Sequence, residues 1–157
     1  AFQQPIRFKG ITVFDLLKLS SEKEINKAEA CEILSKVGLC AKEYVDREIN
    51  SSLSGGEIKR IEIATVAVRN SKFTIFDEPE AGIDLWSFTN LIKAFEEIKT
   101  DHSRSLLIIS HQERIMNIAD YIAVVADGKV SRMGTREEIL PTLMNETGSA
   151  CCSLRNK

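Results

Sequence analysis

Two short apolar runs, each followed directly by polar residues, constrain the fold of this chain more than any other feature. The first, FTIF at 73–76, runs into Asp77 and Glu78. The second, SLLIIS at 105–110, runs into His111. Unbroken apolar runs of this length are typical of strands buried on both faces of a parallel sheet. Because the carboxyl ends of such strands meet where α/β proteins bind ligands, we expect these acids and the histidine at a common edge.

The rest of the sequence predicts a helical part before the first run and a hairpin near the end. Helices are expected over six segments: 12–19, 22–37, 54–69, 84–99, 111–118 and 135–144. Gly38 fits the position just past a helix end. Asp127-Gly128, between 121–126 and 129–134, is the signal of a two-residue hairpin turn. This order of elements predicts an α/β fold, a parallel sheet with an α-helical subdomain.

Composition narrows the classes of function. The 157 residues carry a formal net charge of −2, so no basic field favours nucleic acid, and we expect no nucleic-acid partner. The longest apolar run, Tyr121–Ala126, is far shorter than the roughly 20 residues of a membrane-spanning helix. We expect a cytoplasmic protein with reduced thiols. The sequence leaves open what the four cysteines do, since no C-x-x-C pair or nearby histidine marks a metal site: Cys31, Cys40, Cys151 and Cys152.

The segment 51–60, SSLSGGEIKR, places two glycines at the start of a helix. Ser54 and Glu57 have the spacing of a capping box, which is sufficient to begin an ordinary helix. A cap does not need Gly55 and Gly56, because each glycine weakens a helix by roughly 1 kcal/mol relative to alanine. Glycines here would let a ligand approach bare backbone N–H groups at a helix N-terminus, which suits phosphate. The segment therefore predicts either a simple cap or a phosphate-binding site.

The acids after the first run have the chemistry of a metal and proton-transfer site. Asp77 offers the hard oxygen that Mg²⁺ prefers, and Glu78 can orient or deprotonate a water. A solvated acidic loop is the alternative. His111 can donate to a phosphate oxygen, but Ser110 and Glu113 also have capping-box spacing. His111 as the first residue of an ordinary helix is therefore an equal alternative.

Taken in order, these parts resemble the ABC-type ATPases across essentially the whole chain. LSGGE at 53–57 resembles the signature motif, FTIFDE the Walker B strand, and AGID at 81–84 the D-loop. The resemblance implies ATP and Mg²⁺ as cofactors, and hydrolysis of ATP to ADP and phosphate. It implies that Asp77 binds Mg²⁺, that Glu78 is the catalytic carboxylate and that His111 is the switch histidine. The residues it implies at the nucleotide are Gln3, Ser54, Gly55, Gly56, Glu57 and Asp84.

The resemblance also implies a division of the chain. Residues 1–5 would end an N-terminal core lobe with the Q-loop, in which Gln3, rather than Gln4, senses metal and water. Residues 6–70 would form the helical subdomain and 71–157 the P-loop NTPase (RecA-like) α/β core. The phosphate loop G-x-x-x-x-G-K-[ST] is absent from the sequence.

The missing phosphate loop suggests that this is the C-terminal part of an ABC ATPase. In the family, the signature motif closes over ATP that a second subunit holds, in a head-to-tail dimer. We therefore expect this chain alone neither to bind ATP tightly nor to hydrolyse it. We also expect poor solubility, since a sheet without its neighbouring strands exposes apolar surface and strand edges.

Within the family, the motifs look closest to the SufC-like branch, soluble ATPases of iron–sulfur cluster assembly. Glu57 and TVAV at 65–68 stand where transporter ATPases more often carry glutamine and RALA. DEPEAGID also departs from the common SALD of the D-loop. This implies a SufB/SufD-like scaffold as partner, docked around residues 6–50. The alternative is the ATP-binding subunit of a membrane ABC transporter, with a permease docked at the same place.

Two other classes of protein compete with these. A DNA-repair or chromosome-organising ATPase would need a long coiled coil between Gln3 and Ser54. Those residues are 51 positions apart (54 − 3), without sustained heptads. A non-catalytic module that lost its nucleotide fits the missing phosphate loop but leaves Asp77, Glu78 and His111 unexplained.

Overall fold

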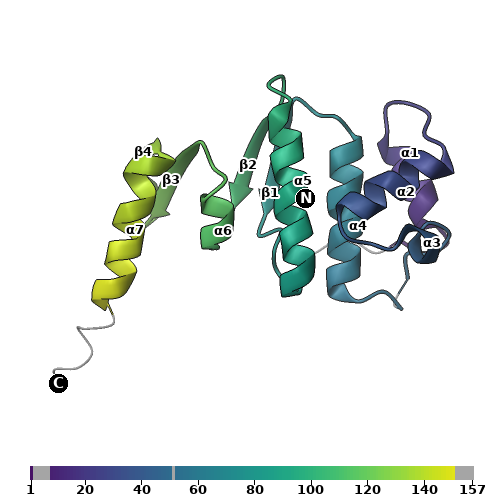
Figure 1. The fold of residues 1–157 in the computed structure, drawn as a ribbon, viewed down its shortest axis with the longest axis horizontal. Helices are drawn as coiled ribbons and strands as arrows, with labels where there is room; N and C mark the ends of the chain where they lie inside the picture. The colour runs from purple at the N-terminus through teal and green to yellow at the C-terminus, as the bar shows by residue number, and fades with distance from the viewer. Residues whose placement is uncertain (2–7, 51, 151–157) are drawn as a thin grey trace. The chain divides into compact units, whose positions relative to one another are not determined.

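The computed structural model describes residues 1, 8–50 and 52–150, with side chains as far as residue 145 (Figure 1). The chain forms two compact units, Ala1–Ser110 and His111–Lys157. The predicted Q-loop residues Gln3 and Gln4, and the cysteines Cys151 and Cys152, lie outside the described residues.

Helices dominate the first unit. Its helices are α1 (Val13–Ser20), α2 (Lys27–Lys36), α3 (Ala41–Tyr44), α4 (Gly55–Val68) and α5 (Leu85–Thr100). Capping boxes begin α1, α2 and α4, where Thr12, Asn26 and Ser54 exchange hydrogen bonds with an acid three residues on. Figure 1 shows α4 between α5 and the group of α1, α2 and α3. Helix α4, the last helix of the predicted helical subdomain, therefore lies between the other helices of that subdomain and α5.

The helical subdomain differs from its prediction in two places. Helix α2 begins at Lys27 rather than at residue 22, because the Asn26 cap with its acid fixes the start. Helix α3 was not predicted, since four residues without a side-chain cap carry no periodic pattern. Gly38 has φ of 76°, and Leu39 N–H donates to the carbonyl of Leu34 at 3.0 Å. This confirms Gly38 as the residue that ends α2.

The predicted parallel sheet is confirmed. Strands β1 (Phe73–Asp77) and β2 (Ser105–Ile109) pair in parallel, from Phe73 opposite Ser105 to Asp77 opposite Ile109. On the other edge of β1, the Ala1 ammonium donates to the carbonyl of Ile75 at 2.8 Å. Asp77 N–H donates to the Ala1 carbonyl at 3.3 Å. These two bonds have the pattern of a parallel bridge, so β1 has a neighbour on both edges.

Only one face of this sheet is covered within the described part of the first unit. Phe76 is fully buried and packs edge-on against Phe95 of α5, with ring centroids 4.9 Å apart. The expectation of strands buried on both faces is therefore wrong for this unit, because α5 covers one face and the other stays open. The side chains of the open face are 44–58% exposed: Phe73, Ile75, Leu107 and Ile109. This apolar exposure is what we expect of a sheet without its neighbouring elements.

The second unit is a hairpin with two helices, α6 (Glu113–Met116), β3 (Tyr121–Ala126), β4 (Lys129–Thr135) and α7 (Arg136–Ala150). Strands β3 and β4 pair antiparallel. Asp127 and Gly128 have φ of 50° and 71°, so the predicted two-residue turn is confirmed. Helix α6 is shorter than predicted, since its N-cap Gln112 makes no side-chain cap bond. Helix α7 continues past the predicted end at residue 144, with Pro141 inside it.

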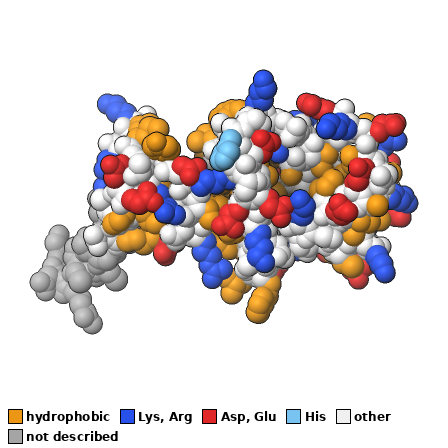
Figure 2. All heavy atoms as spheres, turned by 45° about the horizontal axis from the view of Figure 1, so that its top comes forward, with side chains coloured by type: hydrophobic (Ala, Val, Ile, Leu, Met, Phe, Trp, Pro, Cys, Tyr) orange, Lys and Arg blue, Asp and Glu red, His pale blue; other side chains and the backbone are white. Residues whose placement is uncertain are grey.

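The face of the molecule drawn in Figure 2 carries no large field of one sign among its described residues. Figure 2 shows acidic, basic and apolar side chains intermixed over the face that is drawn. Within the described ranges, no helix is both long and apolar enough to cross a membrane.

We expect Phe95→Ala to lower the free energy of unfolding by about 3–5 kcal/mol, because the change opens a cavity beside Phe76. The urea midpoint of the 157-residue chain measures it. Trp86→Ala is the matched control, since Trp86 is 84% exposed; it should stay within about 0.5 kcal/mol of the parent. Equal midpoints for the two variants would contradict the assignment of this ring pair to the core.

We expect the double change Ile75→Thr, Leu107→Thr to raise solubility and lower the fluorescence of a dye that binds apolar surface. Threonine keeps strand propensity while removing apolar area from the open face of the sheet. Leu19→Thr is the control, because Leu19 is also exposed (74%) but lies in α1. Unchanged dye binding in the double variant would show that this face is covered in solution.

Candidate functional site

The predicted capping box at the start of α4 is confirmed. The Ser54 N–H donates to Oε2 of Glu57 at 2.6 Å, and the Glu57 N–H donates to Oγ of Ser54 at 3.3 Å. Ser54 is extended, and the helix that follows has 14 residues. The box satisfies the N–H of Ser54 and of Glu57, while the N-terminal end of the helix keeps a partial positive charge.

The two glycines of the motif, Gly55 and Gly56, have different surroundings, so glycine is favoured at each position for a different reason. A Cβ on Gly55 would meet nothing within 4 Å, so there is open space on that side of the residue. A Cβ on Gly56 would lie 2.8 Å from the carbonyl oxygen of Gly82. Gly56 is thus required by close packing against the predicted D-loop, independently of any ligand. That these glycines expose backbone N–H groups to phosphate stays a prediction. Only Gly55 needs this explanation, because packing already accounts for Gly56.

Arg60 connects the signature helix to the elements around it. Its guanidinium donates to the Gly56 carbonyl at 3.2 Å, to the Gly38 carbonyl at 3.0 Å and to Oγ of Ser87 at 2.7 Å. These acceptors belong to the start of α4, the end of α2 and the first turn of α5. The sequence analysis missed Arg60, because an arginine four residues after a glycine on a helix carries no signal of tertiary partners.

Glu57 is held from the side of α3. The Tyr44 hydroxyl donates to Oε1 of Glu57, and Nη1 of Arg47 lies 3.8 Å from the same oxygen. The hydrogen bond from Tyr44 keeps the pKa of Glu57 below its usual range, and the same bond raises the pKa of Tyr44. Both carboxylate oxygens of Glu57 therefore already accept hydrogen bonds. The predicted contact of Glu57 with nucleotide stays a prediction. The structure gives it no support, because neither oxygen of the carboxylate is free of hydrogen bonds.

Asp77 and Glu78 stand at the end of β1, as predicted. Asp77 is its last residue, and Glu78 has φ of 42°, a left-handed backbone that a residue other than glycine seldom adopts. Such conformations cost about 1–3 kcal/mol and cluster at functional sites. The Glu78 N–H donates to the Ile109 carbonyl at 2.9 Å, so the turn begins from a fixed point on the sheet. The two adjacent carboxylates fit Mg²⁺, which binds through one or two carboxylates plus phosphate oxygens and waters.

Glu80, directly before the predicted D-loop, contacts the residue that follows β2. It is buried, and the Ser110 hydroxyl donates to its Oε1. Within the described residues, Oε2 of Glu80 has no hydrogen-bond partner. The alternative capping box of Ser110 with Glu113 is wrong, because α6 begins at Glu113 after a different N-cap.

His111 is exposed and lies before α6 rather than inside a helix. It opens the second unit, whereas Asp77 and Glu78 belong to the first. That His111 meets these acids stays a prediction.

Asp84 is confirmed as the cap of α5. Its Oδ1 accepts the N–H groups of Trp86 at 3.1 Å and Ser87 at 3.0 Å. Hydrogen bonding by Ser87 holds the pKa of Asp84 below its usual range. The carboxylate is exposed, and its predicted contact with nucleotide stays a prediction.

Lys59 is a buried cation that the sequence analysis also missed. Its side chain is 1% exposed, and Nζ lies 3.6 Å from Oε2 of Glu62 and 3.5 Å from the Asp77 carbonyl. The charge is therefore compensated inside α4, next to the end of β1. Together with Gly56 and Arg60, it places the signature helix against the strand end and the D-loop.

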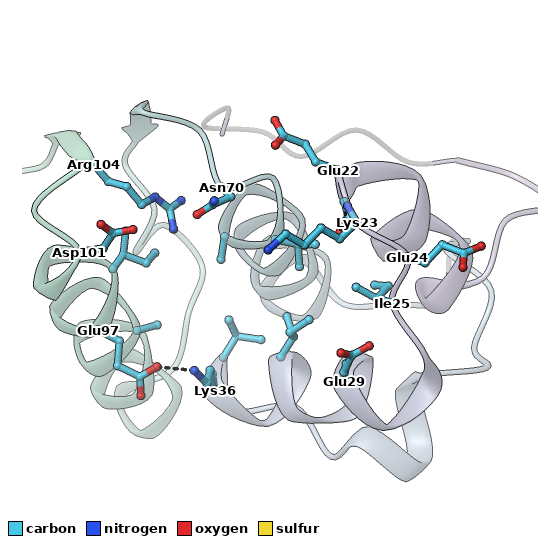
Figure 3. Close-up of a pocket in the computed structure, with 17 residues that line it drawn as sticks. Glu22, Lys23, Glu24, Ile25, Glu29, Lys36, Asn70, Glu97, Asp101 and Arg104 are labelled. Carbon is cyan, nitrogen blue, oxygen red and sulfur yellow. Dashed lines mark hydrogen bonds and ion pairs between the residues drawn. The ribbon is translucent and has the colours of Figure 1, made fainter.

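A hollow of about 510 Å³ lies elsewhere in the first unit (Figure 3). It is bordered by the α1–α2 loop, α2, and the last turns of α4 and α5. Figure 3 shows Lys36 and Glu97 joined across it, with their charged atoms 2.8 Å apart. Its α4 wall is Ala67 and Val68, at the end of the helix opposite the signature motif. A helix of 14 residues is about 20 Å long, so this hollow is remote from Gly55.

Comparisons with known proteins agree on one family. Residues 1–81 match the family model described as ABC transporter. An uncharacterized ABC transporter ATP-binding protein of Methanocaldococcus jannaschii is 36% identical over 154 residues, which cover 94% of this chain and 61% of that protein. A phosphate import ATP-binding protein of Saccharolobus solfataricus is 32% identical, over 92% of this chain and 59% of its own length. The chain thus spans about 60% of the length of these relatives.

A bacterial Atm1-family ABC exporter, solved with ATP bound, has a similar fold. The TM-score is 0.74 over 89% of this chain and 25% of the exporter chain. The identity of 20% makes this a likeness of fold alone.

We expect Gly56→Ala to destabilise the chain by about 1–3 kcal/mol, because the new methyl group meets a backbone carbonyl that cannot turn aside. Gly55→Ala is the matched variant, since it enters open space and alanine favours a helix. Urea unfolding of the two variants measures the difference. Equal losses would contradict the packing reason given for Gly56.

Proposed function

The chain belongs to the ABC transporter family, and from this premise we propose that it is the signature-motif part of the ATP-binding subunit of a transport system. The observation that supports this best is the start of α4. There, Gly55 has open space on its Cβ side at the N-terminal end of a helix. The acid of the capping box is engaged on the side of α3. The Ser54 N–H is already occupied by the Glu57 carboxylate, so an anionic group would approach the Ser54 hydroxyl and the Gly55 backbone.

In this proposal, Ser54 and Gly55 bind the terminal phosphate of an ATP that a second ATPase subunit holds. The two subunits would form a head-to-tail dimer with ATP between them. The proposal assigns Gly56 a different task from Gly55. Gly56 lets α4 approach the D-loop, so the bare amides are held at a fixed place rather than on a mobile loop.

The strand-end acids would serve hydrolysis. Asp77 would hold Mg²⁺, which when bound neutralises charge on the phosphates. Glu78 would accept a proton from the attacking water, and His111 would donate to the transferred phosphate. Gln3 would sense metal and water. The left-handed backbone of Glu78 and its bond to Ile109 support this role, because they fix where the carboxylate leaves the sheet.

The phosphate-binding loop is not among the 157 residues. We propose that residues of the natural protein outside this sequence supply it, as the greater length of the relatives suggests. On this account, the 157 residues alone do not turn ATP over.

The partner is proposed to be a membrane permease, with the subunit on its cytoplasmic side. Supporting this, a hollow of about 230 Å³ between α1 and α4 is lined in part by apolar residues such as Phe8 and Leu16, with Glu62 and Arg69 also at its wall. Leu19, also in α1, is 74% exposed. The named relatives are likewise transporter ATP-binding proteins.

The second candidate is a SufC-like ATPase with a SufB/SufD-like scaffold on the same face, favoured by Glu57 and DEPEAGID. Recovery of the subunit with membranes or with the soluble fraction separates the two.

We expect Glu78→Gln, in the longest natural polypeptide that contains this sequence, to lower Mg²⁺-dependent ATP turnover by about 10²–10⁴-fold while ATP binding persists. Glu96→Gln on the exposed face of α5 is the control and should leave turnover unchanged. The 157-residue chain assayed beside them should show no turnover. Robust Mg²⁺-dependent hydrolysis by that chain, or full activity of Glu78→Gln, would overturn the proposal.

A further inference from the structure

Three side chains form a closed group beside the signature motif. The Tyr44 hydroxyl donates to the Glu57 carboxylate, and Nη1 of Arg47 lies 3.8 Å from the same oxygen. The Arg47 guanidinium also stacks over the Tyr44 ring, 5.3 Å from its centroid. The Glu57 side chain is 19% exposed, so water screens this group only in part. We call Tyr44, Arg47 and Glu57 the signature brace.

The brace also reaches the chain that leads into α4. Nη2 of Arg47 donates to the Ser52 carbonyl at 3.2 Å, two residues before the N-cap. From the other side, Glu57 accepts the N–H of Ser54 at 2.6 Å. The backbone entering the helix is therefore fixed at two points by side chains that themselves contact each other.

Two other capping boxes of the first unit provide an internal comparison. Their acids, Asp15 in α1 and Glu29 in α2, are both exposed. Within the described part of the chain, the hydrogen bonds that their carboxylates accept come from their own N-cap residues, Thr12 and Asn26. A capping box therefore does not need a phenol or a guanidinium to form. The brace on α4 is therefore not required to begin the helix, and its role is to be sought elsewhere.

The negative charge of Glu57 indicates what the signature brace does. A carboxylate at the third position of α4 lies within one turn of the amides proposed to bind phosphate, where its charge would repel the ligand. We infer that Tyr44, with Arg47, is a positioning residue for the signature motif. It holds one oxygen of the Glu57 carboxylate toward α3 while the other stays on the Ser54 N–H, and so keeps the carboxylate away from the Gly55 backbone that would face the nucleotide of the second subunit. The inference rests on the proposed function and deepens it, since it makes α3 a control point of the trans site.

The variant Tyr44→Phe tests this in the longest natural polypeptide that contains the sequence. It removes one hydroxyl and keeps the ring beneath Arg47. We expect the KM for ATP to rise about tenfold, the effect of losing a hydrogen bond to a charged group. We expect kcat to change less than about twofold, because the variant does not touch Asp77 or Glu78. Tyr121→Phe, the change of the exposed second tyrosine, is the control and should leave both constants unchanged.

A cycle with Glu57→Gln separates positioning from general loss of structure. Glutamine keeps an oxygen for the capping box but carries no charge to be turned away. In that background we expect Tyr44→Phe to raise KM by less than about threefold. The same tenfold rise in both backgrounds would show that Tyr44 does not act through Glu57 and would overturn the inference.

A spectroscopic readout needs no turnover. The 157-residue chain has two tyrosines, so Tyr121→Phe leaves Tyr44 as the only phenol. Because the bond to Glu57 raises the pKa of Tyr44, its ultraviolet titration should lie above that of free tyrosine and fall back in Glu57→Gln. An ordinary titration in both would show that the brace is absent, which overturns the inference.

The outcomes distinguish the two proposals. If the parent polypeptide hydrolyses ATP and Tyr44→Phe leaves its KM unchanged, the inference fails while the proposed function stands. If the parent shows no nucleotide binding or turnover, the proposed function fails and the inference with it. A raised KM that disappears in the Glu57→Gln background supports both.

Discussion

The contacts of the Arg60 guanidinium are the constraint on which the rest of the candidate site depends. One side chain connects the signature glycine Gly56, the end of α2 at Gly38 and the start of α5 at Ser87. These elements carry the signature motif, the helical subdomain and the residues after the D-loop. Since Gly56 also approaches Gly82 too closely for a Cβ, the motif and the D-loop cannot separate without breaking both contacts. The site is therefore a property of packing and not of a flexible loop.

Much of this arrangement follows from the sequence. The two short apolar runs, the first followed by Asp77 and Glu78 and the second by His111, predict the two strands that pair in parallel. The capping residues Ser54 and Asp84 are predicted because they bond to their own backbone neighbours. The start of α2 was set too early because apolar spacing continues through residues that Asn26 keeps out of the helix.

What could not be predicted depends on distant partners. Tyr44, Lys59, Arg60 and Glu80 acquire their meaning from contacts 13 to 30 residues away, and local pattern carries no such information. The second glycine shows the same limit, because the pair looks alike in sequence while only Gly56 has a neighbour within reach of a Cβ. The pattern of apolar residues likewise does not predict that one face of the sheet is exposed. Strand length and composition do not reveal which elements cover a strand.

The position of β1 between Ala1 and β2 has a consequence for motion. The amide of Asp77 donates to Ala1 on one edge, and the next amide, that of Glu78, donates to Ile109 on the other. Neither can exchange its hydrogen with solvent unless pairing on that edge opens, which is rarer than fraying of a loop. The backbone of Asp77 is therefore expected to fluctuate little. Movements of the neighbouring turns need not displace its carboxylate.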